Sequence, residues 1–412
     1  MIRFEAPPYA HQTRIEAFDE VMEVLRSPHF VQNSHKESEP VYGDVLLMTD
    51  GQEHLARRAT FSSMFSRSAL QFLETEALMP PIQQILQDLS RTADSEGVAR
   101  ADLVPLVRSM LTRITALVTG VDGVDTEEKT NRFREQVALL AAASAVEWSM
   151  RSHVEVLDEG VQALNECVEE FLRPSLNRRR KLVAEQAELS GDENTLPVDL
   201  LTLIALHEKS EGYEEDYIWR ECVLALVAAS ATTTQALPLA FVHLEEWLKD
   251  HPEDRARLDD PEFLRRAATE SLRLHLPAPA LSRKATGDVT LKSGREITEG
   301  EEVALFFTHS NLDTSKFGED AAEYDLEREL PKGTQPWGLN FGNGVHMCIG
   351  RPLVTGLANK ADPSQATEGT MVKILRTLYQ RGIELDPENP PVRNRTTVED
   401  SYESVPILLR KL

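Results

Sequence analysis

The most constraining feature of the sequence is a long apolar run from Cys222 to Leu244. A membrane-spanning helix is the first explanation to weigh, because such a helix needs about 20 mostly apolar residues. Polar residues from Ser230 to Gln235 interrupt the centre of the run, acids stand at Glu221 and Glu245, and no basic flank marks either end. These features favour a helix buried inside a large globular domain.

Three consecutive threonines, Thr232 to Thr234, lie at the midpoint of this predicted helix. Threonine is a poor helix former, and its hydroxyl tends to bond the carbonyl one turn earlier, which weakens or bends a helix. Pro238 follows, and it cannot donate to the carbonyl of Thr234. We therefore expect a distortion in the middle of the helix, and a distortion there marks a place to look for function.

Helical periodicity dominates most of the chain. A short strand and an amphipathic helix are predicted over 13–27, and strand-like alternation occurs between 281 and 307 and over 404–409. The pattern indicates a mainly α fold with small β-sheets, although a length of 412 residues alone suggests two or three domains. Further helices are predicted over 51–65, 69–92, 102–119, 127–147, 154–182, 196–209, 214–249, 261–275 and 367–381.

Charge and the start of the chain exclude some classes of protein. The formal net charge of -24 argues against nucleic acid as the main partner, because phosphate binding needs a compensating basic surface. The one dense basic run, Arg178 to Lys181, is interpreted as a solvated helix end. The first ten residues lack the apolar core of a secretory signal, so we expect a cytoplasmic protein with no membrane partner.

Cysteine is rare, with one residue each at Cys167, Cys222 and Cys348. Their wide spacing and odd number support neither a disulfide framework nor a zinc site. Cys348 lies in the glycine-rich stretch Phe341–Gly350, just before a possible helix start that would favour a thiolate. Such a thiolate is a metal ligand or a nucleophile, unless the side chain merely packs beneath a turn.

Each chemical role for Cys348 makes different demands. A nucleophile needs a base, and His346 is two residues away, but nothing in so short a loop ensures that the two side chains meet. Zinc would need further cysteines or histidines close by, and none occur. A single axial thiolate is what one class of haem iron uses.

The stretch from Phe341 to Gly350 resembles the haem-binding signature Phe-x-x-Gly-x-x-x-Cys-x-Gly of the cytochrome P450 family, the haem-thiolate monooxygenases. All four fixed positions match, at Phe341, Gly344, Cys348 and Gly350. His346 stands where bacterial members commonly carry histidine or arginine. The motif is specific, and with the matches below the resemblance covers residues from about 15 to 412.

Other stretches match the family in order. Glu270 and Arg273 resemble the Glu-x-x-Arg motif beneath the haem, with Arg328 as the later arginine that completes this structural network. Asp313 ends a stretch from 309 that resembles the family's Ala-Asn-Arg-Asp. The residues that the resemblance assigns to the haem propionates are His54, Arg58, Arg283 and His346.

The resemblance implies a triangular, mainly α fold that forms a single domain over residues 1–412, shortened at its N-terminus relative to the family. Haem b would lie between the helix from Cys222 to Leu248 and the loop that carries Cys348, its axial ligand. Thr232 and Thr233 would help to bind and protonate dioxygen, the co-substrate. Other contacts to the cofactor would come from Ala228, Phe341, Gly342 and Gly350.

The resemblance further implies monooxygenation of a small-to-medium hydrophobic or natural-product substrate. Electrons would come from NAD(P)H through ferredoxin reductase and ferredoxin, and basic residues at Arg57, Arg67 and Arg351 would meet the acidic ferredoxin. The alternatives are a peroxide-driven oxidation, an oxidative coupling, and a haem-binding sensor without turnover. The expected substrate pocket consists of Val227, Ala228, Ala231, Ala278, Leu281, Tyr402 and Glu403.

Three departures from the family pattern affect these expectations. Ala229 replaces a glycine and Ala231 replaces the acid that precedes the oxygen-binding threonine, so the proton path must use other groups. A polar insertion from Asn359 to Gly369 follows the cysteine loop on the side where the family docks electron donors. The short N-terminus would open the substrate entrance, and the insertion would alter partner choice.

Overall fold

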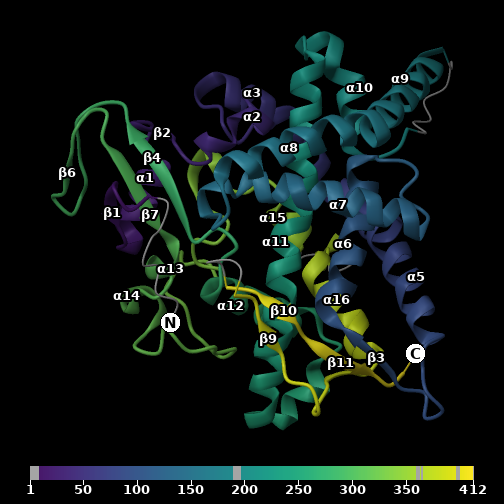
Figure 1. The fold of residues 1–412 in the computed structure, drawn as a ribbon. Helices are drawn as coiled ribbons and strands as arrows, with labels where there is room; N and C mark the ends of the chain where they lie inside the picture. The colour runs from purple at the N-terminus through teal and green to yellow at the C-terminus, as the bar shows by residue number, and fades with distance from the viewer. Residues whose placement is uncertain (1–8, 189–195, 359–361, 363–364, 396–399, 412) are drawn as a thin grey trace.

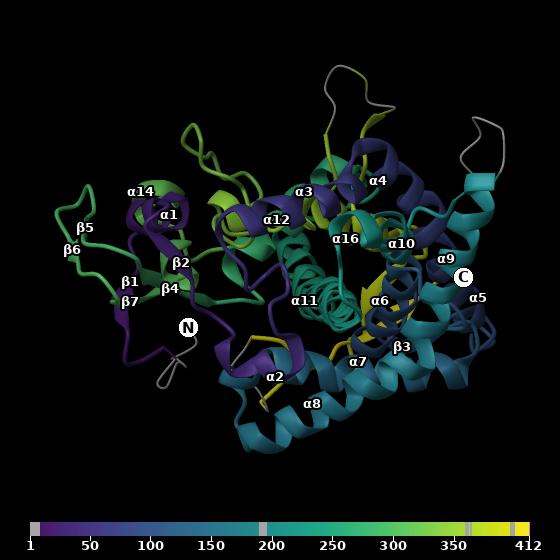
Figure 2. The same ribbon diagram turned by 90° about the horizontal axis from the view of Figure 1, so that it is seen from above.

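The protein is organised around one central helix. The computed structural model describes residues 9–188, 196–358, 362, 365–395 and 400–411. Helix α11 (Glu215–Asp250) runs through the middle of the molecule, as Figures 1 and 2 show from two directions. The helices that pack most extensively against it are α6 (Leu103–Thr119), α7 (Glu127–Ser144) and α12 (Pro261–Leu274).

Among the described residues, α11 alone is long and apolar enough to cross a membrane, by length and composition. Its apolar side chains contribute to both large buried clusters of the helical part, with Leu226 in one and Phe241 in the other. The helix therefore serves as the core of a globular fold, as its polar centre predicted.

The longer of the remaining helices form from amphipathic segments at the predicted places, with small shifts of their ends. Single π-helical turns at Glu74–Leu78 and Val168–Leu172 divide two long predicted helices. The bounds are α1 (Phe18–Arg26), α2 (Glu39–Tyr42), α3 (Gly51–Ser62), α4 (Arg67–Leu73), α5 (Met79–Ser90), α8 (His153–Cys167), α9 (Arg173–Glu188), α10 (Leu200–Glu211), α13 (Phe307–Ser310), α14 (Thr314–Phe317), α15 (Arg351–Thr355) and α16 (Thr370–Gln380). The short helices α2, α13 and α14 lie outside the predicted helical ranges.

A four-stranded sheet forms one corner of the molecule, beside α1 and away from most of the helices (Figure 1). The strand that starts at Thr13 pairs in parallel with the strand that ends at Phe306, and the other neighbouring strands of the sheet pair antiparallel. Alternate side chains of the sheet pack against α1, through Ile15, Val303 and Leu305. In spatial order the strands are β1 (Thr13–Ile15), β7 (Glu302–Phe306), β4 (Ala280–Ala285) and β2 (Phe30–Gln32).

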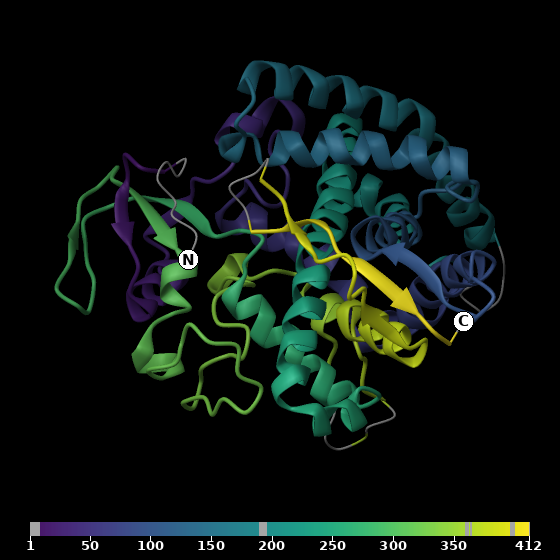
Figure 3. The same ribbon diagram turned by 60° about the horizontal axis from the view of Figure 1, so that its bottom comes forward.

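A three-stranded antiparallel sheet joins distant parts of the chain, so that the yellow C-terminal strand lies beside a blue strand from the first third (Figure 3). Two short hairpins complete the β structure, and the prediction of a mainly α fold with small sheets is confirmed. The strands are β3 (Ala99–Asp102), β11 (Pro406–Leu409) and β8 (Ile383–Leu385), then β5 (Val289–Thr290) with β6 (Glu296–Ile297), and β9 (Val392–Arg393) with β10 (Tyr402–Ser404).

The predicted distortion does not interrupt the central helix, since α11 is helical from Glu215 to Asp250. The hydroxyls of Ser230 and Thr232 do bond carbonyls one turn earlier, those of Leu226 and Ala228. Packing of neighbouring helices on several sides holds the segment helical in spite of its threonines and its proline.

The interpretation of Arg178 to Lys181 as a solvated helix end is wrong for its central residues. Arg179 lies inside α9, is buried, and forms ion pairs with Asp199 and Asp122. Arg180 pairs with Glu208 of α10. The run therefore fastens α9 to α10 and to the loop after α6, since a buried guanidinium requires such partners.

The predicted insertion from Asn359 to Gly369 lies partly outside the described residues, as do the first eight residues of the chain. On the described side, α15 ends at Thr355 and α16 begins at Thr370. Leu357 and Thr367 form a β-bridge between these two helices. The two ends of the insertion are thus held together.

Glu270, Arg273 and Arg328 form one buried ion-pair network at the end of α12. Arg273 donates to Glu270 through two nitrogens, at 2.9 and 2.7 Å, and Arg328 donates to the same carboxylate at 3.1 Å. Arg273 is fully buried and also donates to the backbone carbonyls of Asn311 and Ala321, at 2.8 and 2.7 Å. Three separate segments therefore depend on one guanidinium.

Replacing Arg273 by alanine is expected to lower the free energy of unfolding by about 3 to 5 kcal/mol, because it leaves Glu270 buried with a missing partner. Chemical denaturation of the purified protein measures this loss. The control is Arg410→Ala, which removes an exposed pair with Glu384 and should cost less than about 1 kcal/mol. Equal effects of the two substitutions would contradict the structural role of the network.

Candidate active site

A cavity of about 320 Å³ lies between α11 and the loop that carries Cys348. One face of α11 supplies residues at helical spacing, from Glu221 through Ala225, Ala228 and Thr232. Side chains from α6 and from the region of α3 close the cavity on other sides, and they are almost all apolar. The cavity therefore combines a large apolar surface with few polar groups, which is typical of a small-molecule site.

The α11 wall is made of small residues where it faces the cavity. The Thr232 hydroxyl lies open to the cavity and donates to the carbonyl of Ala228 at 2.9 Å, and Thr233 lines the cavity from a buried position. Ala229, which stands where the family has glycine, also lines the cavity. Ala231 does not, and it packs against the helical core instead.

Cys348 faces the cavity from a loop whose backbone is tightly fixed. The amide of Cys348 donates to the carbonyl of Phe341 at 2.8 Å. Burial raises the pKa of the thiol, while the N–H groups of Gly350 and Arg351 and the charge of Arg58 oppose that effect by favouring the thiolate. Cys167 and Cys222 are buried among apolar side chains.

Gly344 allows this loop to approach α1 closely. Its φ is +69°, and a Cβ at this position would lie 2.1 Å from the carbonyl oxygen of Leu25. Gly342 also has a positive φ, +63°, but a Cβ there would have no neighbour closer than 3.9 Å. A side chain at Gly342 would incur only the cost of the backbone conformation, whereas a side chain at Gly344 would also collide with α1.

We expect Gly344→Ala to destabilise the protein far more than Gly342→Ala, because both incur the αL cost of about 1 to 2 kcal/mol but only the first forces the loop away from α1. Thermal unfolding of both variants measures the difference. Similar melting temperatures would mean that the contact with Leu25 does not fix the loop.

A polar cluster lies beside the Cys348 loop. The rings of His54 and His346 are 4.0 Å apart between centroids, and His346 bonds Asp50 at 2.9 Å. Arg283, which is buried, lies near Asp50 and donates to Gln32. The structure thus gathers residues from four distant parts of the chain.

Burial and pairing shift the pKa values of this cluster. Burial lowers the pKa of Arg283 to about 10, although the nearby Asp50 carboxylate opposes the shift. Burial also lowers the pKa of His346, against the bond from Asp50. Burial opposes ionisation of Asp50, but the bonds from His346 and the Gln32 amide hold its pKa below the usual range. Within the cluster, the Asp50 carboxylate therefore balances the charge of the Arg283 guanidinium.

The four residues assigned to propionates lie together but do not line the cavity. Arg58 donates to the carbonyl of Met347 in the loop, and both ring nitrogens of His54 bond backbone carbonyls, at 3.0 and 3.1 Å. Arg283 and His346 bond Gln32 and Asp50. To bind a carboxylate of the cofactor, His54 would have to give up a backbone partner, whereas the guanidinium groups of Arg58 and Arg283 have further N–H donors.

The expected pocket residues fall into two groups. Ala228 and Ala278 line the cavity, as do Phe341 and Gly350, whereas the others do not. Val227 precedes Ala228 in α11, and its side chain packs in the helical core instead of facing the cavity. Leu281 pairs with Leu305 in the sheet, and the Tyr402 ring packs beneath Arg393. The residues absent from the cavity wall are Val227, Ala231, Leu281, Tyr402, Glu403 and Gly342.

Several residues that line the cavity belong to no recognisable sequence motif. Asn340 lines it with a buried side-chain oxygen that has no hydrogen-bond partner. Thr115 and Thr119 reach it from α6. Glu221 lines it two turns before Ala228, and its only sequence signal is an acid at the edge of the apolar run.

The side chains that could ligate a metal limit which metal-containing cofactor the cavity can hold. Among the described residues, no three histidine, cysteine, aspartate or glutamate side chains are placed to hold a metal ion. Cys348 therefore offers one sulfur ligand to a metal that brings its remaining ligands with it. A planar macrocycle with a central iron meets this condition, and the apolar cavity walls suit its faces.

Over residues 12–355 the chain matches the cytochrome P450 family. Mycinamicin IV hydroxylase/epoxidase from Micromonospora griseorubida is 29% identical over 364 residues, which cover 84% of this chain and 79% of that protein. The chain belongs to the cytochrome P450 family, and it is a monooxygenase of that type. Membership implies a haem cofactor and dioxygen.

Solved structures agree with this fold. The crystal structure of CalO2 has a TM-score of 0.71 at 18% identity, covering 98% of this chain and 92% of that one. CYP109E1 from Bacillus megaterium in complex with corticosterone has a TM-score of 0.69 at 20% identity, covering 97% and 93%. The expected cytochrome P450 fold is confirmed.

Glu221 makes stability depend on pH. Burial raises its pKa to about 7, from an ordinary value of 4.5, against the Leu46 amide and Tyr217, which favour the ionised form. Between these two values the folded protein binds more protons than the unfolded chain. This group's contribution to stability therefore falls as pH rises.

We expect Glu221→Gln to gain roughly 3 kcal/mol of unfolding free energy relative to the wild type between pH 5 and pH 8, because glutamine has no charge to bury. Chemical denaturation at the two pH values measures the gain. The exposed Glu214→Gln reports the effect of removing one negative charge from the same end of α11. A difference that does not change with pH would mean that Glu221 is ionised throughout.

Proposed function

We propose that the chain, as a single domain, is a haem-thiolate monooxygenase that holds haem b through Cys348 and inserts one oxygen atom of dioxygen into a hydrophobic substrate. The observation that carries the proposal is that Cys348 and the Ala228–Thr232 face of α11 line one cavity. When bound, the haem would supply the redox chemistry of dioxygen activation, and the Cys348 thiolate would hold its iron.

The protein's own residues would bind and orient the cofactor. His54, Arg58, Arg283 and His346 supply donors for the propionates, since guanidinium and imidazole bind carboxylates well. Asp50 keeps His346 and Arg283 in place and limits the net charge of the cluster. The apolar lining would limit the amount of water in the rest of the site.

Thr232 would hold a proton at Oγ1, where it now donates to the Ala228 carbonyl. Rotation about χ1 would redirect this donor into the cavity, and Thr233 lies beside it. Ala231 offers no acid to resupply the proton, so water in the cavity would have to do so. Proton delivery by water would therefore differ from the family pattern, in which an acid precedes the threonine.

The substrate class follows from the lining and from relatives. The lining is mostly apolar, with a small number of threonines and one carboxyl group. One relative hydroxylates or epoxidises mycinamicin IV, and a structural neighbour binds corticosterone. We infer a hydrophobic substrate of small-to-medium size, such as a natural product.

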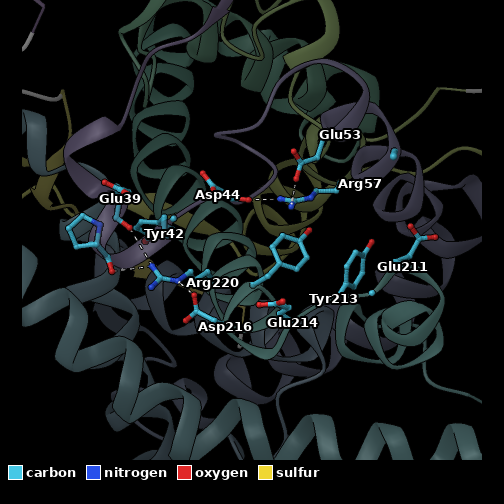
Figure 4. A pocket seen from close by; sticks show the side chains of 15 residues that line it. Glu39, Tyr42, Asp44, Glu53, Arg57, Glu211, Tyr213, Glu214, Asp216 and Arg220 are labelled. Carbon is cyan, nitrogen blue, oxygen red and sulfur yellow. Dashed lines mark hydrogen bonds and ion pairs between the residues drawn. The ribbon is translucent and has the colours of Figure 1, made fainter.

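Electrons would come from NAD(P)H through ferredoxin reductase and ferredoxin in the cytoplasm. Arg67 and Arg351 are partly exposed near the Cys348 side of the molecule, and Arg351 also lies over the Trp337 ring. Arg57 bonds Glu53 and the Asp44 backbone at the edge of a separate surface hollow (Figure 4), so it is less free to meet an acidic partner.

The difference spectrum of the dithionite-reduced protein with carbon monoxide tests the ligand. The wild type should show a Soret maximum far to the red, and Cys348→Ser should lose it because serine cannot supply the thiolate. Arg410→Ala serves as a remote control. A red-shifted maximum that survives in Cys348→Ser would refute the assignment.

Steady-state turnover distinguishes the oxygenase from the alternatives. Substrate should stimulate NAD(P)H consumption only when ferredoxin and its reductase are present. Because Ala231 replaces the family's acid, a peroxide-driven oxidation is the second candidate, and turnover with hydrogen peroxide alone would favour it. If neither the ferredoxin system nor hydrogen peroxide supported turnover, the remaining candidate would be a haem-binding sensor without catalysis.

A further inference from the structure

The walls of the inner cavity carry very little charge. Among the described residues that line it, Glu221 and Cys348 are the only ones with ionisable side chains, and none is a lysine, arginine or histidine. Cys348 lies where the metal group is proposed to bind. Glu221 is therefore the one charged group that the cavity offers to a substrate.

Glu221 is held in place by the backbone and not by a cation. Its side chain is 4% exposed, and Oε2 accepts from the Leu46 amide at 2.8 Å. Burial raises its pKa to about 7, so the carboxylate, when ionised, is a buried negative charge. Such a charge is costly unless a partner balances it.

The basic group that acts on Glu221, Arg57, lies on the other side of the wall. Arg57 affects the electrostatics of Glu221, but its guanidinium lies over the Tyr217 ring and bonds Glu53 and the Asp44 carbonyl. These residues line the surface hollow of about 650 Å³ that Figure 4 shows. The cavity side of Glu221 therefore has no basic partner among the lining residues.

Glu221 and Thr232 mark two distant points on the same face of α11. They are eleven residues apart, which corresponds to about three turns and about 16 Å along the helix axis. A substrate that contacts both must be long. One end would meet the carboxylate while the other lies at the position of oxidation.

We propose that Glu221 binds a basic nitrogen at the end of the substrate remote from the oxidised atom, so that the enzyme acts on elongated hydrophobic amines. The inference rests on the proposed function and specifies its substrate class. An incoming ammonium group balances the buried carboxylate, whereas a carboxylate-bearing substrate would place two like charges in one apolar cavity.

Binding of three probes with the same apolar chain tests the proposal on the haem-loaded protein at pH 8. The probes are dodecyltrimethylammonium, dodecanol and laurate, and the quaternary nitrogen of the first has no lone pair to coordinate iron. Equilibrium dialysis gives the dissociation constants, and the shift in melting temperature provides an independent readout. All concentrations must stay below micelle formation.

The wild type should bind the cation about tenfold more tightly than the alcohol, and laurate most weakly. Glu221→Gln should abolish the preference for the cation and improve binding of laurate, while its affinity for dodecanol stays within about threefold of the wild type. Glu214→Gln is the matched control, because Glu214 lies on the same helix end but lines the surface hollow.

Unchanged affinity of Glu221→Gln for the cation would overturn the proposal. Loss of cation binding in Glu214→Gln but not in Glu221→Gln would place the amine in the surface hollow and would also overturn it. The carbon monoxide spectrum separates this result from failure of the proposed function, because the thiolate spectrum should be the same in both variants and the wild type.

Discussion

Helix α11 must be buried on most sides and still form one wall of a cavity, and both demands act on the same 36 residues. Large apolar side chains such as Leu226 and Phe241 face the two cores, while Ala225 and Ala228 face the cavity. The Thr232 hydroxyl is bonded within the helix, to the carbonyl of Ala228, so it needs no partner from the cores. Any shift of α11 would disturb core packing and the site together.

Local chemistry made much of this structure predictable. Amphipathic periodicity located the longer helices because each buries one face, and alternation located β4 and β7 of the larger sheet but not β2. The Cys348 loop was predictable because its glycines and its cysteine are close in sequence. The threonines and Pro238 do not interrupt α11, because tertiary packing, which no local pattern records, outweighs the low helix propensity of threonine.

Long-range contacts account for what sequence patterns missed. The role of Arg179 depends on Asp199 and Asp122, which approach it only in the folded chain. Tyr402 was expected in the pocket but packs with Arg393 of the neighbouring strand. Glu221 was visible only as an acid beside an apolar run, and its value as a binding group depends on which face of α11 borders the cavity.

The paired ends of the insertion between α15 and α16 have a further consequence. Gly356 and Gly369 approach so closely that a Cβ on Gly369 would lie 2.2 Å from the Gly356 nitrogen, and the bridge between Leu357 and Thr367 adds to this closure. The chain therefore leaves and re-enters the fold at one point. Doubling the length of such a loop costs only about 0.6 kcal/mol, so this position can accept additional sequence at little cost to the rest of the protein.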